Sequence, residues 1–413
     1  MSKLLYAWEF GANLGHIGTF LPVARELRRR GHDVHWVVTH TNQAAKLLDR
    51  DGFTWLQAPT IGETRREGPP LSYADILLRF GYANGEDLLG LAVAWRQLFI
   101  LVKPSLVLAD HSPTAILAAR TLDIPVMLFG SGFFAPPQMS PTPNLRPWTN
   151  VPMEQLARIE AESMASINFV IKHFAKPPLA FLAELFQVAE TALLTFPELD
   201  HYAQRGPAAY WGTLPAAVAD PPHWTSNERP RVYAYLRASS PHFEPALRAL
   251  HGLNRPCLIY CPDLPDLLRQ RYSSPWVHFA ALPVDLTQVA QQADAAVTYG
   301  SPAATIAFLL AGKPVLMIPG HLEQFLFSLR VEGFGAGLLI NSEQPPTDLA
   351  QKLQRILVEP SFADNARAFA KKYEFFNQSQ VITHLANRIE ELATAKGKSR
   401  LEASPAPSGA ILG

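Results

Sequence analysis

A histidine and an aspartate have types and positions suited to proton transfer. His16 lies in Gly15-His16-Ile17-Gly18, between a short apolar run and the first predicted helix. Glycines let the backbone turn sharply, and a helix start points free amides outward. An imidazole at such a turn can take a proton from an incoming hydroxyl, so His16 is a candidate general base. The alternative is a histidine that only packs or caps at the helix start.

Asp110 directly follows the apolar run Leu106–Ala109, at the carboxyl end of a predicted strand. A carboxylate that accepts a hydrogen bond from one imidazole nitrogen selects the tautomer and stabilises the imidazolium. We therefore expect Asp110 to orient the base. Two alternatives stay open, because His111 competes with His16 as the base and Asp110 could cap the helix predicted near Pro113.

The elements that must position these residues alternate between strands and helices. The first half predicts strands at Leu4–Trp8, Val34–Val38, Phe53–Leu56, Ser105–Ala109, Pro125–Phe129, Ala192–Thr195 and Ala209–Gly212. Helices are predicted between them, at Leu21–Arg30, Ala44–Asp49, Leu88–Val102, Ala115–Thr121, Met153–Phe174 and Leu179–Val188. Continuous apolar strands separated by helices indicate a parallel sheet covered on both faces, with ligands at the carboxyl ends of its strands.

The chain is long enough for two cores. Its 413 residues exceed the size at which one hydrophobic core stops growing, and the strand–helix pattern restarts at Arg231. We expect an N-terminal domain over 1–214, a linker over 215–230, a C-terminal domain over 231–393 and a flexible tail over 394–413. The fold class is α/β, with two facing doubly wound, Rossmann-like parallel sheets.

Charge and cysteine content exclude several classes of protein. There are 36 basic and 36 acidic side chains, so the chain lacks the basic footprint of a nucleic-acid binder. Only 17% of residues are charged, which permits an apolar ligand or peripheral contact with a membrane surface. Cys257 and Cys261 share one apolar run without histidines at zinc spacing, so we expect buried, reduced thiols, no metal site and a cytoplasmic location.

Several segments, in this order and spacing, resemble family-one glycosyltransferases, which include bacterial macrolide and plant flavonoid enzymes. They are Gly15–Ile17, Leu21–Leu27, Arg30–Val34, Leu106–Asp110, Leu122–Pro125, Phe196–Asp200, Tyr210–Gly212 and Ala311–Pro314. The resemblance reaches to about residue 392. It implies a GT-B fold and metal-independent, inverting transfer of a sugar from a nucleotide diphosphate to a hydroxyl, with no cofactor beyond that co-substrate. His16 is then the base and Asp110 its partner.

The donor-binding loop departs from the family pattern. Where the family has H-G-G-x-G-T, this chain has Tyr299-Gly300-Ser301-Pro302-Ala303-Ala304, followed by Thr305. Gly300 is kept, the hydroxyls of Ser301 and Thr305 can still donate, and Tyr299 stands in the place of the histidine within the expected donor site. A helix start still attracts a phosphate, by about 0.3–1 kcal/mol.

Two further sets of residues complete the expected site. Glu323 and Gln324, in Pro319-Gly320-His321-Leu322-Glu323-Gln324, match the family's sugar-binding segment. An apolar acceptor would bind in the N-terminal domain, against side chains of the proline-rich segment 131–150, namely Phe133, Phe134, Met139 and Trp148. The function expected is sugar transfer from a nucleotide diphosphate to an apolar small-molecule or lipid acceptor. The alternative is a degenerate GT-B protein that binds a ligand or partner without transfer.

Overall fold

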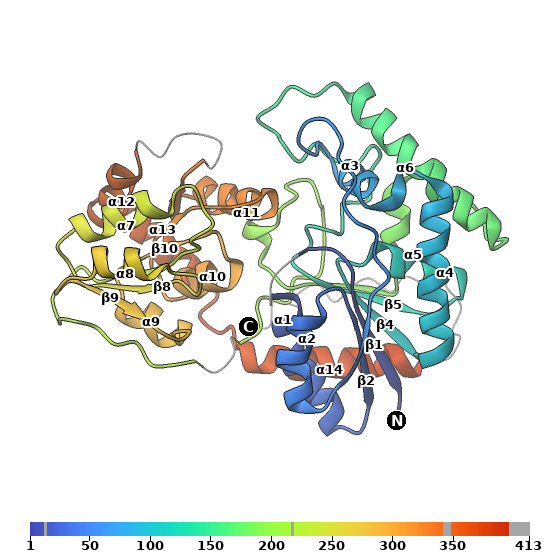
Figure 1. Ribbon diagram of the computed structural model, residues 1–413, viewed down its shortest axis with the longest axis horizontal. Helices are drawn as coiled ribbons and strands as arrows, with labels where there is room; N and C mark the ends of the chain where they lie inside the picture. Colours follow the sequence, from blue (N-terminus) through green and yellow to red (C-terminus); the bar gives the residue numbers. More distant parts are fainter. Residues whose placement is uncertain (12–14, 216–218, 342–347, 396–413) are drawn as a thin grey trace. The chain divides into compact units, whose positions relative to one another are not determined.

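The computed structural model describes residues 1–11, 15–215, 219–341 and 348–395 (Figure 1). The chain divides into two compact units. Unit 1 contains Met1–Phe196, Tyr202–Leu214 and the segment that begins at Asn377, and unit 2 contains Pro197–His201 and Pro215–Phe376. Each unit is built around one six-stranded sheet.

The sheet of unit 1 is parallel and has the order β3-β2-β1-β4-β5-β6. Its strands are β1 (Lys3–Trp8), β2 (Asp33–Val38), β3 (Thr54–Gln57), β4 (Leu106–Asp110), β5 (Val126–Gly130) and β6 (Glu190–Leu193). The order reverses between β1 and β4, and this is the point in a doubly wound sheet where ligands bind. The register pairs Trp8 with Asp110, so the two strands end level with each other.

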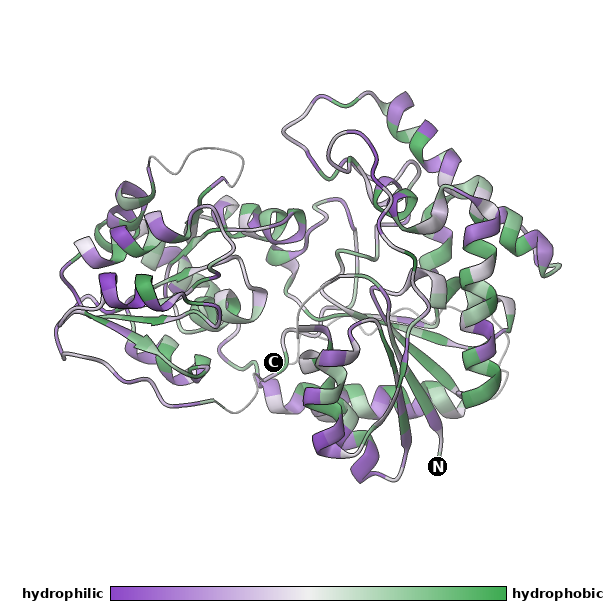
Figure 2. Ribbon diagram, in the orientation of Figure 1, coloured by the Kyte–Doolittle hydropathy of each residue, from purple (hydrophilic) through white to green (hydrophobic). Residues whose placement is uncertain are grey.

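Helices cover both faces of this sheet (Figure 1). They are α1 (Gly15–Arg29), α2 (Thr41–Leu48), α3 (Tyr73–Leu77), α4 (Gly85–Val102), α5 (Pro113–Thr121), α6 (Met153–His173) and α14 (Gln378–Thr394). Short turns are η1 (Asp49–Asp51), η2 (Leu78–Tyr82), η3 (Leu182–Phe186) and, in unit 2, η4 (Pro197–Leu199). The strands of the sheet are mostly hydrophobic in Figure 2, which is typical of strands buried on both sides.

Two elements of unit 1 differ from the sequence prediction. The helix expected over Leu179–Val188 is only the 3-10 turn η3, which follows an extended Phe181. The strand expected over Ala209–Gly212 is a single bridge between Tyr210 and Leu193. Gly206 has a positive φ and Pro207 has no amide hydrogen, so the chain cannot join β6 earlier.

Helix α14 belongs to unit 1, although the sequence analysis placed it in the C-terminal domain. Val381, Leu385 and Ile389 form its buried stripe, and it packs against α1. Glu390 accepts hydrogen bonds from Arg30 (2.8 Å) and from His32 (2.7 Å). The helical pattern predicts an apolar face but carries no information about which core covers it, and that explains the error.

The sheet of unit 2 is also parallel, with the order β12-β11-β10-β7-β8-β9. Its strands are β7 (Val232–Tyr235), β8 (Cys257–Tyr260), β9 (Val277–Ala280), β10 (Ala295–Thr298), β11 (Val315–Met317) and β12 (Gly337–Leu339). Its helices are α7 (Phe243–Gly252), α8 (Asp266–Tyr272), α9 (Leu286–Gln292), α10 (Pro302–Leu310), α11 (Leu322–Gly333), α12 (Leu349–Val358) and α13 (Pro360–Lys372). The order reverses between β7 and β10, so this unit is doubly wound as well.

The remaining predictions about the chain concern its linker, tail and cysteines. The expected linker contains no helix or strand in 219–230, and Asp220 forms a bridge to Val284. The predicted tail lies outside the described residues from residue 396 onward. Cys257 and Cys261 are buried and free, as predicted, and burial raises the pKa of each thiol to about 12. Among the described helices, none has the length and apolar character needed to cross a bilayer.

Glu9 is a buried carboxyl group in unit 1 that the sequence analysis did not single out. It follows β1 and is 2% exposed, and its Oε2 accepts a hydrogen bond from the amide of Thr114 (2.9 Å) in the first turn of α5. Its Oε1 is buried without a hydrogen-bond partner among the described residues. Burial raises the pKa of Glu9 to about 8, and the bonds from the helix start offset only part of this effect.

This raised pKa predicts how the Glu9→Gln variant responds to pH. The unfolded chain releases the Glu9 proton near pH 4.5 and the folded chain only near pH 8. The contribution of Glu9 to the free energy of unfolding of the wild type therefore decreases as pH rises from 4.5 to 8. Glu9→Gln should therefore gain stability relative to wild type as pH rises from 5 to 8.5, as measured by urea denaturation.

The matched control is Glu26→Gln on α1. Hydrogen bonds from Arg29 and then Arg30 lower the pKa of Glu26 to about 2, so Glu26 is ionised in both states over this range. Its variant should show a constant difference from wild type between pH 5 and pH 8.5. A Glu9→Gln difference that is equally independent of pH would contradict the raised pKa.

Candidate active site

The structure brings His16 and Asp110 together at the strand-order reversal of unit 1. His16 is the second residue of α1, and Asp110 ends β4. Their side chains meet through His16 Nδ1 and Asp110 Oδ2, 2.9 Å apart. Asp110 does not cap α5, because the residue at the cap is Ser112 and the first turn of that helix is bonded to Glu9. The carboxylate faces the imidazole instead.

The surroundings of His16 fix the direction of its ring. The ring stacks on the indole of Trp8, with centroids 4.8 Å apart and planes 19° apart. Trp8 is itself held by a hydrogen bond from Nε1 to the carbonyl of Phe10 (2.6 Å). With a hydrogen on Nδ1 directed at Asp110, Nε2 carries the lone pair of the ring. The His16 side chain is 19% exposed, so an imidazole base at this position is reachable from solvent.

His111, the competing candidate base, has a different environment. It is 8% exposed, and its ring stacks on Phe134 with centroids 5.0 Å apart. Phe10 and Phe133 present their edges to the same ring, and Tyr73 lies 6.0 Å from it. Enclosure by aromatic rings favours a packing role for His111, and the geometry therefore favours His16 as the base.

The four expected acceptor residues fall into two pairs. Phe133 and Phe134 are 5% and 4% exposed and pack around His111. Met139 and Trp148 are 38% and 44% exposed. Sequence reasoning missed Phe10 and Tyr73, which complete the aromatic group around His111. Phe10 follows β1 closely, and Tyr73 opens α3, so both read as ordinary apolar positions.

The donor loop of unit 2 forms a tight turn at the carboxyl end of β10. Gly300 has φ +77°, and Ser301 stands at the cap of α10 without a side-chain bond to that helix. The Thr305 hydroxyl is buried and lies 3.0 Å from that of Thr298, which also accepts a hydrogen bond from the Gly300 amide. Thr305 therefore supports the turn from inside, where its hydroxyl contacts Thr298, and its expected role as a hydroxyl donor to the diphosphate stays a prediction.

Tyr299 belongs to a group of tyrosines that sequence reasoning missed. Its ring lies edge-on to Tyr235, 4.8 Å away, and Tyr235 contacts Tyr260 at 5.2 Å. Tyr235 and Tyr260 end β7 and β8, and Tyr299 directly follows β10; these three strands are neighbours in the sheet. Burial and the neighbouring Tyr299 raise the pKa of Tyr235 well above its usual value, so this phenol stays neutral and keeps its hydrogen.

Glu323 and Gln324 lie in the first turn of α11, and Gln324 lies beside Gly300. A Cβ at Gly300 would lie 3.0 Å from Gln324 Cβ, so the structure brings these two predicted donor residues together. Gln324 is 8% exposed, and its Oε1 accepts a hydrogen bond from the Gly320 amide (2.9 Å). Glu323 is partly exposed. One polar atom of Gln324 is thus used within the chain.

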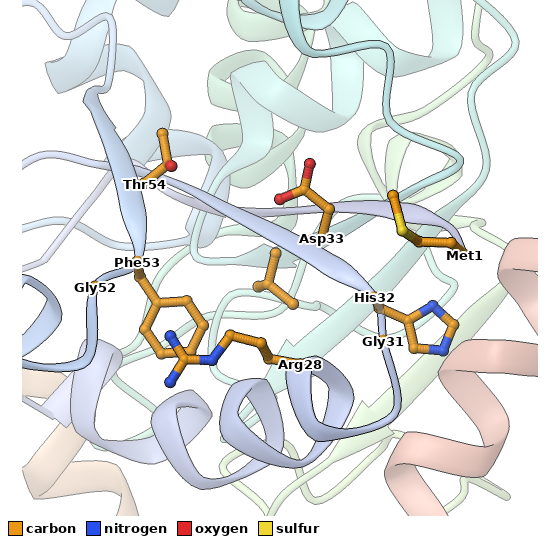
Figure 3. A pocket seen from close by; sticks show the side chains of 9 residues that line it. Met1, Arg28, Gly31, His32, Asp33, Gly52, Phe53 and Thr54 are labelled. Atoms are coloured by element: carbon orange, nitrogen blue, oxygen red, sulfur yellow. The ribbon is translucent and has the colours of Figure 1, made fainter.

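A pocket at the opposite edge of the unit 1 sheet contains none of the predicted residues. Figure 3 shows it at the amino ends of β2 and β3, lined by Arg28, His32, Asp33 and Phe53 among others. The Arg28 guanidinium lies 4.1 Å from the centre of the Phe53 ring. Within the described part of the chain, no group of histidine, cysteine and acidic side chains could hold a metal ion.

Comparison with known proteins identifies the fold. No protein-family description matches the chain, and no curated protein matches its sequence. Among solved structures, the calicheamicin glycosyltransferase CalG4 is similar with a TM-score of 0.71 at 17% identity, over 96% of this chain and 99% of that one. The glycosyltransferase VinC in complex with dTDP has a TM-score of 0.63 at 20% identity, over 94% and 100%.

A third structure, SsfS6 of Streptomyces sp. SF2575 complexed with thymidine diphosphate, has a TM-score of 0.64 at 17% identity, over 95% and 100%. The two doubly wound units therefore form the GT-B fold that these glycosyltransferases share. The predicted fold class is confirmed. At these identities the similarity concerns the fold, and the chemistry must be argued from the residues.

Gly130 lies against Asp110, and its backbone conformation leaves no room for a side chain. It ends β5 with φ +148°, and a Cβ there would overlap Phe134 Cζ and lie 3.0 Å from Asp110 Oδ1. Gly130→Ala should therefore lower the free energy of unfolding by about 2 kcal/mol or more, measured by urea denaturation.

Gly90→Ala is the matched control for this substitution. Gly90 lies in α4 with open space around it, so alanine should be neutral or stabilise the helix by up to about 1 kcal/mol. Equal stability of the two variants would show that Gly130 has no special steric role.

Proposed function

We propose that the chain is an inverting glycosyltransferase that moves a sugar from a nucleotide diphosphate to a hydroxyl of an apolar small-molecule or lipid acceptor. The observation that carries the proposal is the His16–Asp110 pair, at 2.9 Å, on the edge of unit 1 where a doubly wound sheet binds ligands. The GT-B fold and the thymidine diphosphate in the SsfS6 structure support a nucleotide donor.

In the proposed reaction, His16 Nε2 takes the proton of the acceptor hydroxyl. The oxygen attacks the anomeric carbon from the face opposite the nucleotide, a new carbon–oxygen bond forms, and the bond to the diphosphate oxygen breaks. The diphosphate leaves with that electron pair, and the configuration at the carbon is inverted. Asp110 stabilises the imidazolium that results, because its carboxylate accepts the Nδ1 hydrogen.

The donor half of the proposal uses the turn before α10. The amides at the start of this helix and the hydroxyls of Tyr299 and Ser301 would meet the charge of the leaving diphosphate without a metal ion. Glu323 and Gln324 would bind sugar hydroxyls. In unit 1, the acceptor would lie against the exposed Met139 and Trp148 and the aromatic group that contains Phe133 and Phe134.

A second candidate function is ligand binding without sugar transfer. The observation that favours it is the donor turn itself. There the Thr305 hydroxyl and Gln324 Oε1 already form hydrogen bonds within unit 2. A protein that kept only the acceptor pocket would need no open diphosphate site. Donor binding and turnover separate the two candidates.

The turnover experiment replaces the base. His16→Ala should lower kcat by about a hundredfold to ten-thousandfold, because an aligned general base contributes that much, while circular dichroism stays unchanged. The matched control is His35→Ala, which breaks a histidine–aspartate pair of similar length (2.8 Å, to Asp33) away from the site and should keep wild-type turnover. Loss of turnover in His111→Gln with retention in His16→Ala would reverse the assignment.

The binding experiment tests the donor turn. Wild type should bind thymidine or uridine diphosphate in isothermal titration, and Gly300→Ala should weaken binding at least about tenfold, because φ +77° and the contact with Gln324 resist a Cβ. Gly333→Ala, at the end of α11 with open space around it, is the control and should bind as wild type does. Absence of binding by wild type itself would favour the second candidate.

A further inference from the structure

Tyr6, in the middle of β1, has a hydroxyl group directed at the catalytic pair. The hydroxyl donates to Asp110 Oδ2 at 2.6 Å and lies 2.7 Å from the main-chain carbonyl oxygen of His16, so its single hydrogen is shared between two acceptors. Asp110 Oδ2 is also the atom that contacts His16 Nδ1. One phenol therefore contacts the backbone of the base and the carboxylate that orients its ring.

The ring of Tyr6 is held rigidly, which gives the hydroxyl a fixed position. Tyr6 is fully buried and stacks on Phe20 of α1, with centroids 4.5 Å apart and planes 5° apart. Trp36 of β2 and Phe129 of β5 pack against its other sides, at 4.8 Å and 6.4 Å. Burial and the adjacent Asp110 raise the pKa of Tyr6 well above its usual value, so it remains a hydrogen donor at every working pH.

We propose that Tyr6 is a positioning residue that sets the proton affinity of His16 by sharing the Asp110 oxygen. This inference rests on the proposed function, in which His16 is the base. A carboxylate oxygen that accepts two hydrogen bonds stabilises each donor less than it would stabilise a single donor. Tyr6 thus keeps the imidazole neutral at a lower pH than Asp110 alone would, and it holds the start of α1 at the correct distance.

The other titratable groups near the pair lie on the surrounding elements. His40 precedes α2 and contacts the carbonyl of Gly11 through Nε2 (3.2 Å), Glu9 follows β1 and bonds to α5, and His111 follows β4 among aromatic rings. Strand β5 contributes none, and the next charged residue of α1, Arg25, is more than two turns from His16. Removal of the Tyr6 hydroxyl leaves all of these in place.

The first test measures the titration of His16 directly and needs no turnover. In the full-length chain with labelled histidines, the His16 resonance is assigned by its loss in His16→Gln. In Tyr6→Phe, its titration midpoint should rise by about half a pH unit or more, because Asp110 Oδ2 no longer accepts a hydrogen bond from Tyr6 and stabilises the imidazolium more strongly. An unchanged or lowered midpoint would overturn the proposal, whether or not the protein transfers sugar.

The second test uses kinetics. For Tyr6→Phe, kcat near neutral pH should fall by up to about threefold for each half-unit rise of the His16 midpoint, with KM for donor and acceptor unchanged, and the acid limb of kcat/KM should move to higher pH with that midpoint. A fall of equal size at all pH values would indicate a merely structural role and overturn the proposal. Absence of transfer by wild type would refute the proposed function alone, because the titration still reports on the three residues.

Tyr82→Phe is the matched control, and a second variant guards against misfolding. Tyr82 is also fully buried, and its hydroxyl lies 3.0 Å from that of Thr114, away from the pair. Its variant should lose a similar amount of stability and leave the His16 midpoint unchanged. If Tyr6→Phe does not fold, 3,5-difluorotyrosine incorporated at position 6 provides a stronger donor and should lower the midpoint, and a midpoint that does not fall would overturn the proposal.

Discussion

One carboxylate oxygen, Asp110 Oδ2, is the atom on which the arrangement of unit 1 depends. It is buried, and it lies 2.6 Å from the Tyr6 hydroxyl and 2.9 Å from His16 Nδ1. A buried charge is tolerated only when hydrogen bonds replace the lost water, so β1, β4 and α1 must meet at this point. Trp8 beside Asp110 in the register and Gly130 against its other oxygen complete the enclosure. The geometry of the His16 side chain is therefore a consequence of how the Asp110 carboxylate is hydrogen-bonded.

The expected donor site in unit 2 follows a different principle. Its polar groups satisfy one another, since Thr298 bonds to both Thr305 and Gly300 and Gln324 bonds to Gly320. Tyr299 replaces the imidazole of the resembled pattern, and the charge of a diphosphate would be met by amides and hydroxyls. Binding at such a turn depends on geometry more than on net charge, which agrees with a chain of 36 basic and 36 acidic residues.

Sequence patterns predicted the fold and the pair but not what supports the pair. Buried strands alternating with helices leave few arrangements, and parallel strands share one carboxyl edge, so His16 and Asp110 were expected to meet. Tyr6 and Glu9 could not be recognised, because one reads as a strand core residue and the other as a strand end, and each matters only through a partner about 100 residues away. Gly130 gives no local signal either, since its importance comes from Phe134 and Asp110. The same limit explains why α14 was assigned to the wrong unit, because an amphipathic pattern shows that a helix has a buried face but not which core covers it.

The place of α14 has a consequence for the order in which this chain can fold during translation. The nascent polypeptide emerges from its N-terminus, so α1 with Arg30 and His32 is made long before Glu390, which accepts their hydrogen bonds. Until then the face of α1 that meets Val381, Leu385 and Ile389 lacks its cover. The described part of unit 2 is synthesised during that interval and can be complete first, because it ends at Phe376, before α14. Unit 1, which contains α1, therefore obtains its last described helix only after the described part of unit 2 has been made.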